Sequence, residues 1–341
     1  MGKNLIKKKY DTDIQIIKII AAFFVILLHS SDSDSFSGMF YNGISRFSVP
    51  VFVLVSGYNM LARKPDCKNL VKKCIKLFCL MLAWSAIYYS YGLLFENQSF
   101  TGIKDLLSYL LTEPTHLWYL YATLALYLFT PLLFVFHKSA SRNEYRYALL
   151  LSFLFGSCVI ILLRSDLIPI LSVLLNKMKV PYTLGFICLF LTGGYLRRFG
   201  IQKKTSRLLL YLFGVAGAIV SVIGPLLLPK LGLARDLLLS FFAPNVMLAG
   251  IAFFVFLRQV LQDSPIRSQR LHSLIHEIAS CTLGVYLLHM LILTLLNRFA
   301  EPFFLLLRPC LLIPLRTLLA ALLSTGLVFA AKKIPVLKWL F

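Results

Sequence analysis

Apolar runs of about 20 residues recur along the whole chain, separated by short polar segments. A helix rises about 1.5 Å per residue, so about 20 apolar residues are needed to cross the hydrocarbon core of a bilayer. Runs of this length lie near residues 13–31, 43–62, 70–94, 115–137, 147–164, 182–198, 206–226, 236–258, 279–297 and 309–331. The pattern predicts an all-α, polytopic membrane bundle of about ten transmembrane helices.

The composition agrees with lipid as the solvent for this chain. Of the 341 residues, 59% are hydrophobic and 14% are charged, and the mean hydropathy is +0.80, which is too apolar for a water-soluble globule. No fixed-period repeat and no long linker divides the sequence, so we expect residues 1–341 to form a single transmembrane domain. Pro50, Pro131, Pro225 and Pro244 lie in or beside the runs and predict kinks or span ends.

Basic residues alternate in density from one predicted loop to the next. Segments on the N-terminal side of the bundle hold 24 Lys and Arg residues, and segments on the opposite side hold nine. This asymmetry follows the positive-inside rule and predicts that both termini are cytosolic. The formal net charge of +21 is therefore explained by topology, and we expect no nucleic-acid partner.

Cysteine and histidine spacing predicts no metal centre. The seven cysteines lack CxxC spacing, and no HExxH pattern occurs, so neither a disulfide framework nor a zinc site is expected. His137, His272 and His276 fall on predicted cytosolic loops, where we expect an ordinary solvated role.

Two ionisable residues share one face of the first predicted span. Lys18 and His29 are 11 residues apart, which gives a rise of about 16 Å and directions about 20° apart on a helix. Ionisable groups inside lipid are costly and usually face the bundle interior. One interpretation is a long anionic cofactor such as coenzyme A, with its phosphates on Lys18 and its reactive end at His29. The alternative is that Lys18 snorkels to the headgroups and His29 lies at the interface.

The next two spans carry further polar groups. Ser56 and Gly57 lie in mid-span, where small residues favour close helix packing, although Ser56 is also a possible nucleophile if a base lies beside it. Lys72, Lys73 and Lys76 open the third span. They are typical of a topology signal and are equally able to bind nucleotide phosphates.

One more histidine lies inside a predicted span. His289 is about ten residues into the ninth span, near mid-membrane, where an ionisable side chain indicates function. We therefore expect His29 and His289 to share one cavity.

Five short motifs occur in a fixed order along the chain. They are Lys18-x10-His29, Arg46 through Val49-Pro50-Val-Phe52 to Ser56-Gly57-Tyr58, Lys73-x-x-Lys76, His116-Leu-Trp118-Tyr119, and Gly284-Val-Tyr286-Leu-Leu-His289. Together they resemble the acyltransferase-3 family of bacterial membrane acyltransferases, which acylate cell-surface carbohydrates. Lysine stands at positions 18, 73 and 76 where members carry arginine, and Gln15 stands where members often carry an acid.

The resemblance implies a multi-pass O-acetyltransferase of the bacterial cytoplasmic (inner) membrane. It implies transfer of an acetyl group from cytosolic acetyl-CoA to a hydroxyl of a surface or lipid-linked glycan, with His29 as general base or acyl carrier. The implied catalytic residues are His29, His289, Ser56 and Asp32, the last of which would fix the His29 tautomer. The implied donor-binding residues are Lys18, Lys72, Lys73 and Lys76. The implied substrate-binding residues are Arg46, Tyr58, His116, Trp118, Tyr119 and Tyr286.

Two other classes of function fit the same sequence. A transporter or flippase of an acylated saccharide also needs intramembrane ionisable groups and broken helices, although inverted repeats are then expected and none is visible. A non-catalytic module that binds amino acids or acts as a sensor is the third interpretation, and it would bind its ligand without coenzyme A.

Overall fold

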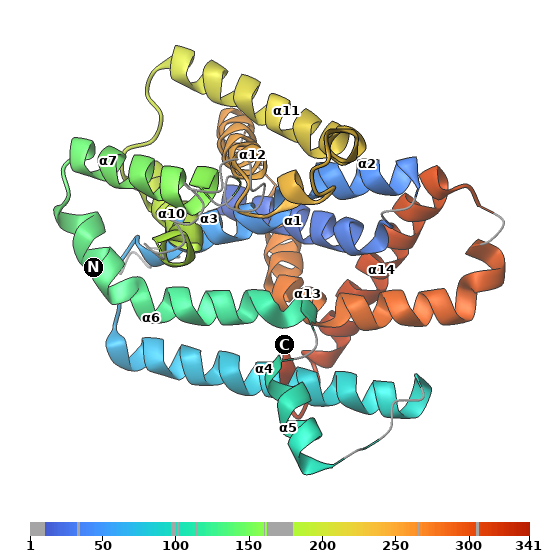
Figure 1. The fold of residues 1–341 in the computed structure, drawn as a ribbon. Coiled ribbons are helices and arrows are strands. Elements are labelled where there is room, and N and C mark those ends of the chain that lie inside the picture. The colour runs from blue at the N-terminus through green and yellow to red at the C-terminus, as the bar shows by residue number, and fades with distance from the viewer. Residues whose placement is uncertain are drawn as a thin grey trace.

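Helices make up the regular structure of this chain. The computed structural model describes residues 11–32, 35–96, 100, 102–112, 115–159, 161, 180–264, 266, 268–304 and 307–341. Within these ranges no strand occurs, and the helices pack into one bundle (Figure 1). The predicted all-α architecture is confirmed.

A helix lies in each of the ten predicted spans. They are α1 (Thr12–Ser30), the pair α2 (Phe36–Ser45) and α3 (Ser48–Met60), α4 (Cys67–Phe95), α6 (Trp118–Ser139), α7 (Arg142–Phe153), α10 (Val180–Arg198), α11 (Lys204–Leu227), α12 (Pro244–Asp263), α13 (Gln269–Phe304) and α14 (Pro309–Ala331). An additional short helix, α5 (Ile103–Thr112), lies between α4 and α6. The end of the fifth predicted span and the start of the sixth lie outside the described residues.

Seven helical segments of the described chain are long and apolar enough to cross a membrane. They are Thr12–Ser30, Phe36–Met60, Trp118–Ser139, Lys204–Leu231, Leu237–Asp263, Gln269–Ala300 and Pro309–Ala331. Lipid offers no hydrogen-bond partner to the backbone N–H and C=O groups, and a helix pairs these groups within itself. Such segments therefore cross the membrane as helices. The protein is therefore a multi-pass membrane protein.

Two of the four prolines singled out in the sequence mark helix starts. The second predicted span is broken at Arg46 and Phe47, and Pro50 then lies in the first turn of α3, where its missing N–H has no intrahelical partner to lose. Pro244 opens α12 in the same way. Pro131 and Pro225 instead lie inside α6 and α11.

Helix α1 occupies the middle of the bundle, with α11 and α4 on opposite outer sides (Figure 1). It packs against α2, α3, α12, α13 and α14. Its residues Ile14, Ile17 and Ala21 belong to one buried apolar cluster, and Ile26 belongs to the other. The helix that carries Lys18 and His29 therefore has neighbours on several sides.

Small residues allow helices α3 and α10 to approach closely. A Cβ added at Gly57 would lie 1.8 Å from the carbonyl oxygen of Phe190, and one added at Gly193 would lie 2.1 Å from that of Leu54. Neither position has room for a side chain. The packing interpretation of the Ser56–Gly57 pair thus has a direct structural basis.

The expectation that three histidines are solvated on loops is wrong. His137 lies in the last turn of α6, buried, with Nδ1 3.0 Å from the Tyr145 hydroxyl. His272 and His276 lie in the first turns of α13 and contact α1. The ring Nδ1 of His272 is 2.8 Å from Thr12 Oγ1, and that of His276 is 2.9 Å from Gln15 Nε2. Because α13 begins earlier than its apolar run, its polar first turns pack against α1.

Substitution at the α3–α10 contact tests this packing. We expect Gly57→Ala to destabilise the folded protein by about 1–3 kcal/mol, because the added methyl overpacks a backbone contact. The matched control is Gly326→Ala in α14, where an added Cβ meets nothing within 4 Å and the lost chain entropy favours alanine. Thermal unfolding of the detergent-solubilised variants measures the difference, and equal midpoints would contradict the packing.

Candidate functional site

Two cavities lie along one face of α1. The first, here the Lys18 cavity, has a volume of about 460 Å³ and is lined by Asp11, Ile14, Gln15, Lys18, Asn59, Ala62, Arg63, Arg197, His276, Ala279 and Ser280. The second, here the His29 cavity, has a volume of about 340 Å³ and is lined by Val25, Leu28, His29, Ser31, Asn42, Arg46, Val49, His116, Trp118, Tyr119, Phe241 and Tyr286.

The same three helices line both cavities. Helix α1 contributes Lys18 to the first and His29 to the second, about 16 Å apart along its axis. Helix α13 contributes Ala279 and Tyr286, which are seven residues apart and therefore on one helix face. Helix α3 and the residues directly after it complete the walls. The two cavities thus lie one after the other along α1 and share no lining residue.

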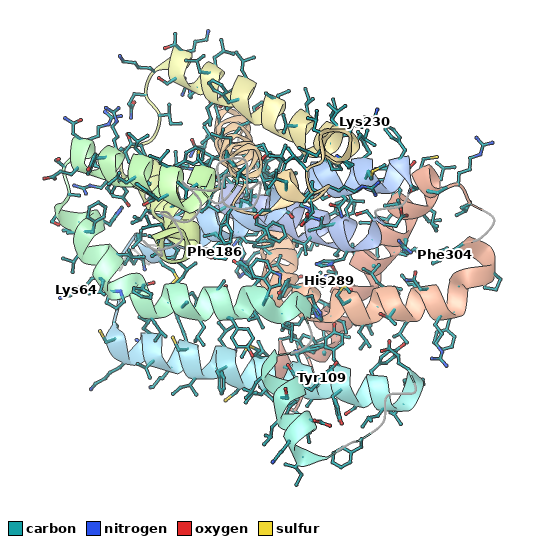
Figure 2. The ribbon with its side chains drawn as sticks, in the orientation of Figure 1. Lys64, Tyr109, Phe186, Lys230, His289 and Phe304 are labelled. Carbon is teal, nitrogen blue, oxygen red and sulfur yellow. The ribbon has the colours of Figure 1, made fainter. Side chains whose placement is uncertain are left out.

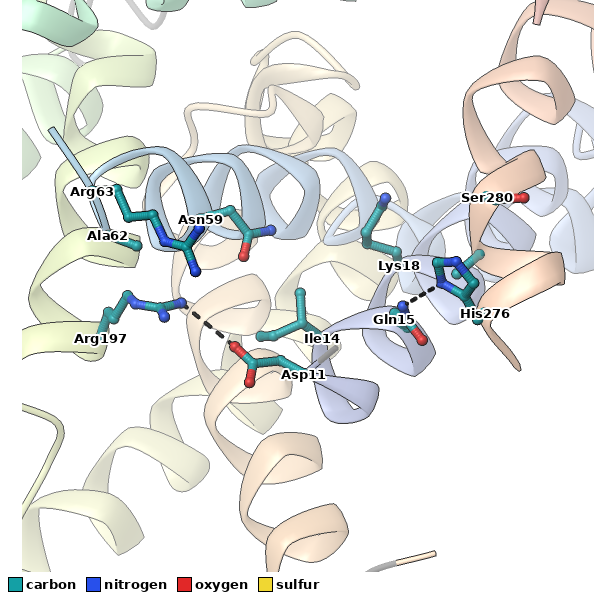
Figure 3. Close-up of a pocket in the computed structure, with 11 residues that line it drawn as sticks. Asp11, Ile14, Gln15, Lys18, Asn59, Ala62, Arg63, Arg197, His276 and Ser280 are labelled. Atoms are coloured by element: carbon teal, nitrogen blue, oxygen red, sulfur yellow. Dashed lines mark hydrogen bonds and ion pairs between the residues drawn. The ribbon is translucent and has the colours of Figure 1, made fainter. Parts of the chain in front are cut away.

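Cations dominate the Lys18 cavity. Lys18 comes from α1, Arg63 follows α3 and Arg197 comes from the last turn of α10, and Figure 3 shows the three around one space. Asp11 is 3.6 Å from Arg197. At the rim, Lys332 from the end of α14 donates to the Ser280 carbonyl at 2.6 Å. The start of α1 and the end of α14 therefore meet at the same end of the bundle.

Three of the predicted donor-binding lysines lie elsewhere. Lys72, Lys73 and Lys76 are exposed on α4, and none of them lines the Lys18 cavity. Helix α4 packs against α6 and α5, so its lysine-rich first turns lie away from α1. Sequence reasoning missed Arg63 and Arg197, whose only signal was their place at the polar ends of two predicted spans.

Imidazole and phenol rings surround the inner end of the His29 cavity. His29 is exposed on α1, and its ring centroid lies 5.2 Å from that of His289. The His289 ring lies 5.8 Å from the His116 ring. His116 itself precedes α6 in the 3-10 turn Thr115–Leu117. The fold therefore brings together histidines that are far apart in sequence.

His289 has a fixed orientation. Its side chain is fully buried, in the interior of the bundle (Figure 2), and its Nδ1 lies 2.6 Å from the Tyr286 carbonyl oxygen. A carbonyl can only accept, so Nδ1 carries the hydrogen and the neutral ring has its lone pair on Nε2. This Nε2 has no hydrogen-bond partner among the described residues.

The outer wall of the His29 cavity is a stack of flat groups. The Arg46 guanidinium lies 5.5 Å from the Phe241 ring, and its Nε donates to Asn42 Oδ1 at 2.8 Å. Phe241 in turn stacks on Trp118 at 5.4 Å, and Phe186 also stacks on Trp118 at 5.7 Å. Two aromatic rings therefore hold the Trp118 indole in place in this wall.

A further cavity continues beyond this wall. It has a volume of about 310 Å³ and shares Arg46, Trp118 and Phe241 with the His29 cavity. Its remaining lining comes from Asp236 and residues 239–242, in the connection between α11 and α12. The wall thus separates the His29 cavity from a second opening at the same end of the bundle.

Two predicted catalytic side chains are occupied by local hydrogen bonds. The Ser56 hydroxyl donates to the Phe52 carbonyl within α3 at 2.9 Å. The Asp32 carboxylate accepts from the Ser35 backbone N–H at 2.8 Å and from the Ser35 hydroxyl at 2.9 Å. These bonds give Ser56 and Asp32 structural roles in α3 and in the turn before α2, and their catalytic roles stay predictions.

Tyr58 lies in a charged clamp instead of a cavity wall. It is buried, and the guanidinium groups of Arg197 and Arg258 lie 4.6 Å from its ring. Arg258 also pairs with Asp13 at 3.2 Å. This arrangement ties α3, α10 and α12 to the start of α1. The other predicted substrate-binding residues, Arg46, His116, Trp118, Tyr119 and Tyr286, all line the His29 cavity.

The histidine cluster is not arranged for a metal ion. Within the described ranges, no group of three or more His, Cys, Asp or Glu side chains has the geometry to hold one. The chemistry available to the two cavities comes from cations, the Asp11 carboxylate, imidazoles, phenols and an indole.

Comparison with known proteins agrees with this arrangement. The sequence model of one family, described as an acyltransferase domain, matches residues 11–332, nearly the whole chain. Among curated proteins and among solved structures, nothing matches the chain. The matched range contains both cavities and all the helices that line them, and the chain belongs to the acyltransferase-3 family.

Proposed function

We propose that this membrane acyltransferase moves an acetyl group from acetyl-CoA to a hydroxyl of a cell-surface or lipid-linked glycan. The observation that carries the proposal is the succession of two cavities along α1, the first lined by cations and the second by imidazoles. In this proposal the Lys18 cavity opens to the bacterial cytosol, which places both chain ends there, and the His29 cavity opens on the outer side of the cytoplasmic membrane.

The Lys18 cavity suits the donor. Coenzyme A carries its phosphates at one end and its thioester at the other. Lys18, Arg63 and Arg197 offer one ammonium and two guanidinium groups, and guanidinium groups bind phosphate oxygens in bidentate geometry. With its phosphates there, the thioester arm points along α1 past Ala21 and Ala22 toward His29. In this proposal Lys72, Lys73 and Lys76 do not bind the donor. Their positive charges instead keep the start of α4 on the cytosolic side of the membrane.

His29 is the group best placed for the transfer. As a general base it takes the proton of the acceptor hydroxyl while the hydroxyl oxygen attacks the thioester carbonyl. The C–S bond then breaks, and the thiolate leaves and takes up the proton. The alternative route forms an acetyl-imidazole at His29 before the hydroxyl attacks. Mixing with acetyl-CoA in the absence of acceptor separates the two, because only the second route breaks the C–S bond and releases a burst of free coenzyme A before a hydroxyl is present.

The His29 cavity suits a sugar hydroxyl on the acceptor. Aromatic rings and an indole form its walls, and Arg46 and Asn42 supply hydrogen-bonding groups. Such a mixture of apolar walls and few polar groups is typical of small-molecule sites.

Removal of the proposed base is the first test. We expect His29→Ala to lower acetyl transfer from labelled acetyl-CoA to envelope glycans at least 100-fold, because a positioned base contributes about 10²–10⁴ in rate. His272→Ala, which removes a histidine outside both cavities, should retain activity. Full activity of His29→Ala at normal protein levels would overturn the assignment, and label that crosses the membrane without reaching a glycan would indicate a transporter.

The donor site is tested by comparing cations inside and outside the Lys18 cavity. We expect Lys18→Ala and Arg63→Ala each to raise the KM for acetyl-CoA about tenfold or more, since a charged hydrogen bond contributes about 1.5–3 kcal/mol. Lys76→Ala, on the exposed face of α4, should change this KM less than twofold. A larger increase in this KM for Lys76→Ala than for Lys18→Ala and Arg63→Ala would instead indicate that the donor phosphates bind at α4.

Cysteine accessibility tests the orientation of the two cavities. In a background with exposed Cys67, Cys79 and Cys310 replaced by serine, we expect Ser31→Cys to react with an impermeant maleimide added to intact cells. Ala62→Cys, in the Lys18 cavity, should react only after the cells are permeabilised. The reverse pattern would invert the proposed topology.

A further inference from the structure

Two buried imidazole nitrogens beside the His29 cavity have no hydrogen-bond partner. His289 is 0% exposed and His116 is 6% exposed, and within the described residues the Nε2 atom of each is buried without a partner. Buried polar atoms in proteins are nearly always paired, and exceptions call for a reason such as a catalytic role. Two exceptions on adjacent rings beside the proposed base point to one shared cause.

The three histidine rings form a continuous line from the cavity into the bundle. His29 and His289 are 5.2 Å apart with an interplanar angle of 50°. His289 and His116 are 5.8 Å apart and nearly perpendicular, at 86°. Because the two Nε2 atoms are sealed from water, only a neighbouring ring can exchange a proton with them.

Two tyrosines fix this line. The Tyr286 carbonyl accepts from His289 Nδ1, and the Tyr286 hydroxyl donates to the His116 carbonyl. The Tyr88 ring lies 4.7 Å from the His116 ring, held by a hydrogen bond from its hydroxyl to the Leu287 carbonyl at 2.8 Å. These contacts hold the His116 and His289 rings in place beside each other.

Further ionisable groups lie in the cavity wall and on α14, where the Arg316 guanidinium donates to the carbonyl of Ser30, the residue after His29. Tyr119 packs 5.8 Å from the Tyr286 ring, and Arg46 lines the opposite side of the cavity. The Arg46 guanidinium is held by Asn42 and Phe241. A proton on His29 would therefore face the fixed Arg46 cation across the cavity.

We infer that His289 and His116 form a proton relay for His29, with His116 as the positioning residue at its inner end. This inference rests on the proposed transfer reaction. The O–H bond of the acceptor breaks as its oxygen bonds to the acetyl carbon, and the proton passes to His29 and then to His289 Nε2. His116 offers the second site for that proton. When the C–S bond breaks, the proton returns through His29 to the thiolate sulfur.

Kinetics of His116 variants test the relay. We expect His116→Gln to lower kcat at least tenfold with the KM for acetyl-CoA within twofold, and to enlarge the solvent deuterium isotope effect on kcat. Added imidazole should restore part of the rate of His116→Ala but none of that of His116→Gln, whose side chain fills the space. An unchanged kcat, or a loss confined to KM, would overturn the relay.

A second buried histidine supplies the matched control. His137 is 7% exposed and lies on α6, outside both cavities, where it contacts Tyr145. His137→Gln removes an imidazole that is as deeply buried as that of His116. It therefore reports how far the loss of any buried imidazole lowers kcat. We expect its isotope effect to match that of the wild type, and an equal enlargement in both variants would contradict a specific role of His116.

Nuclear magnetic resonance of the wild-type protein tests the relay without activity and without a variant. In nanodiscs with ¹⁵N-histidine, rings that share a proton titrate in joint, non-ideal steps. We expect His29, His116 and His289 to show such coupled curves and His137 to titrate by itself. Independent curves for the three rings would overturn the relay. If the wild type transfers no acetyl group, the proposed function is wrong. The titration curves would still show whether the three rings share a proton.

Discussion

The cost of placing an ammonium and an imidazole inside a bilayer is the constraint on which this structure depends. Both groups lie on α1, and hydrocarbon would solvate neither. Helix α1 is therefore surrounded by α2, α3, α12, α13 and α14, and the polar atoms of these helices and of the turns beside them form the two cavities. The central place of α1 and the position of the site have the same physical cause.

Close packing against α10 fixes α3, which lines both cavities. Gly57 and Gly193 bring α3 and α10 into backbone contact, and without a hydrophobic driving force between helices in lipid, such van der Waals contact supplies the association. The Tyr58 clamp adds charged contacts between Arg197, Arg258 and the start of α1. These fixed elements hold the cavity walls apart while apolar contacts elsewhere close the bundle.

The two cavities differ in chemistry. Lys18, Arg63 and Arg197 gather in the first, where the proposed charged donor would enter, whereas imidazole and aromatic rings surround the second, which Arg46 also lines. Tyr286 connects these rings, because its carbonyl orients His289 and its hydroxyl holds His116. A side chain without any charge thus organises the proposed reaction centre.

The sequence by itself determined the properties that follow from local geometry and from lipid as solvent. Apolar run length fixed the ten helical segments, and helix periodicity placed Lys18 and His29 on one face of α1. Only the tertiary structure decided which distant faces meet. It brought His116 and His289 to His29, placed Arg63 and Arg197 in the Lys18 cavity where the α4 lysines had been expected, stacked two rings on Trp118, and placed His137, His272 and His276 in helix contacts. The physical reason is that hydrophobic periodicity is a property of one helix, whereas a contact between helices depends on the surface shapes of both. Small residues such as Gly57 set those shapes, and a single sequence shows no pattern that reveals them.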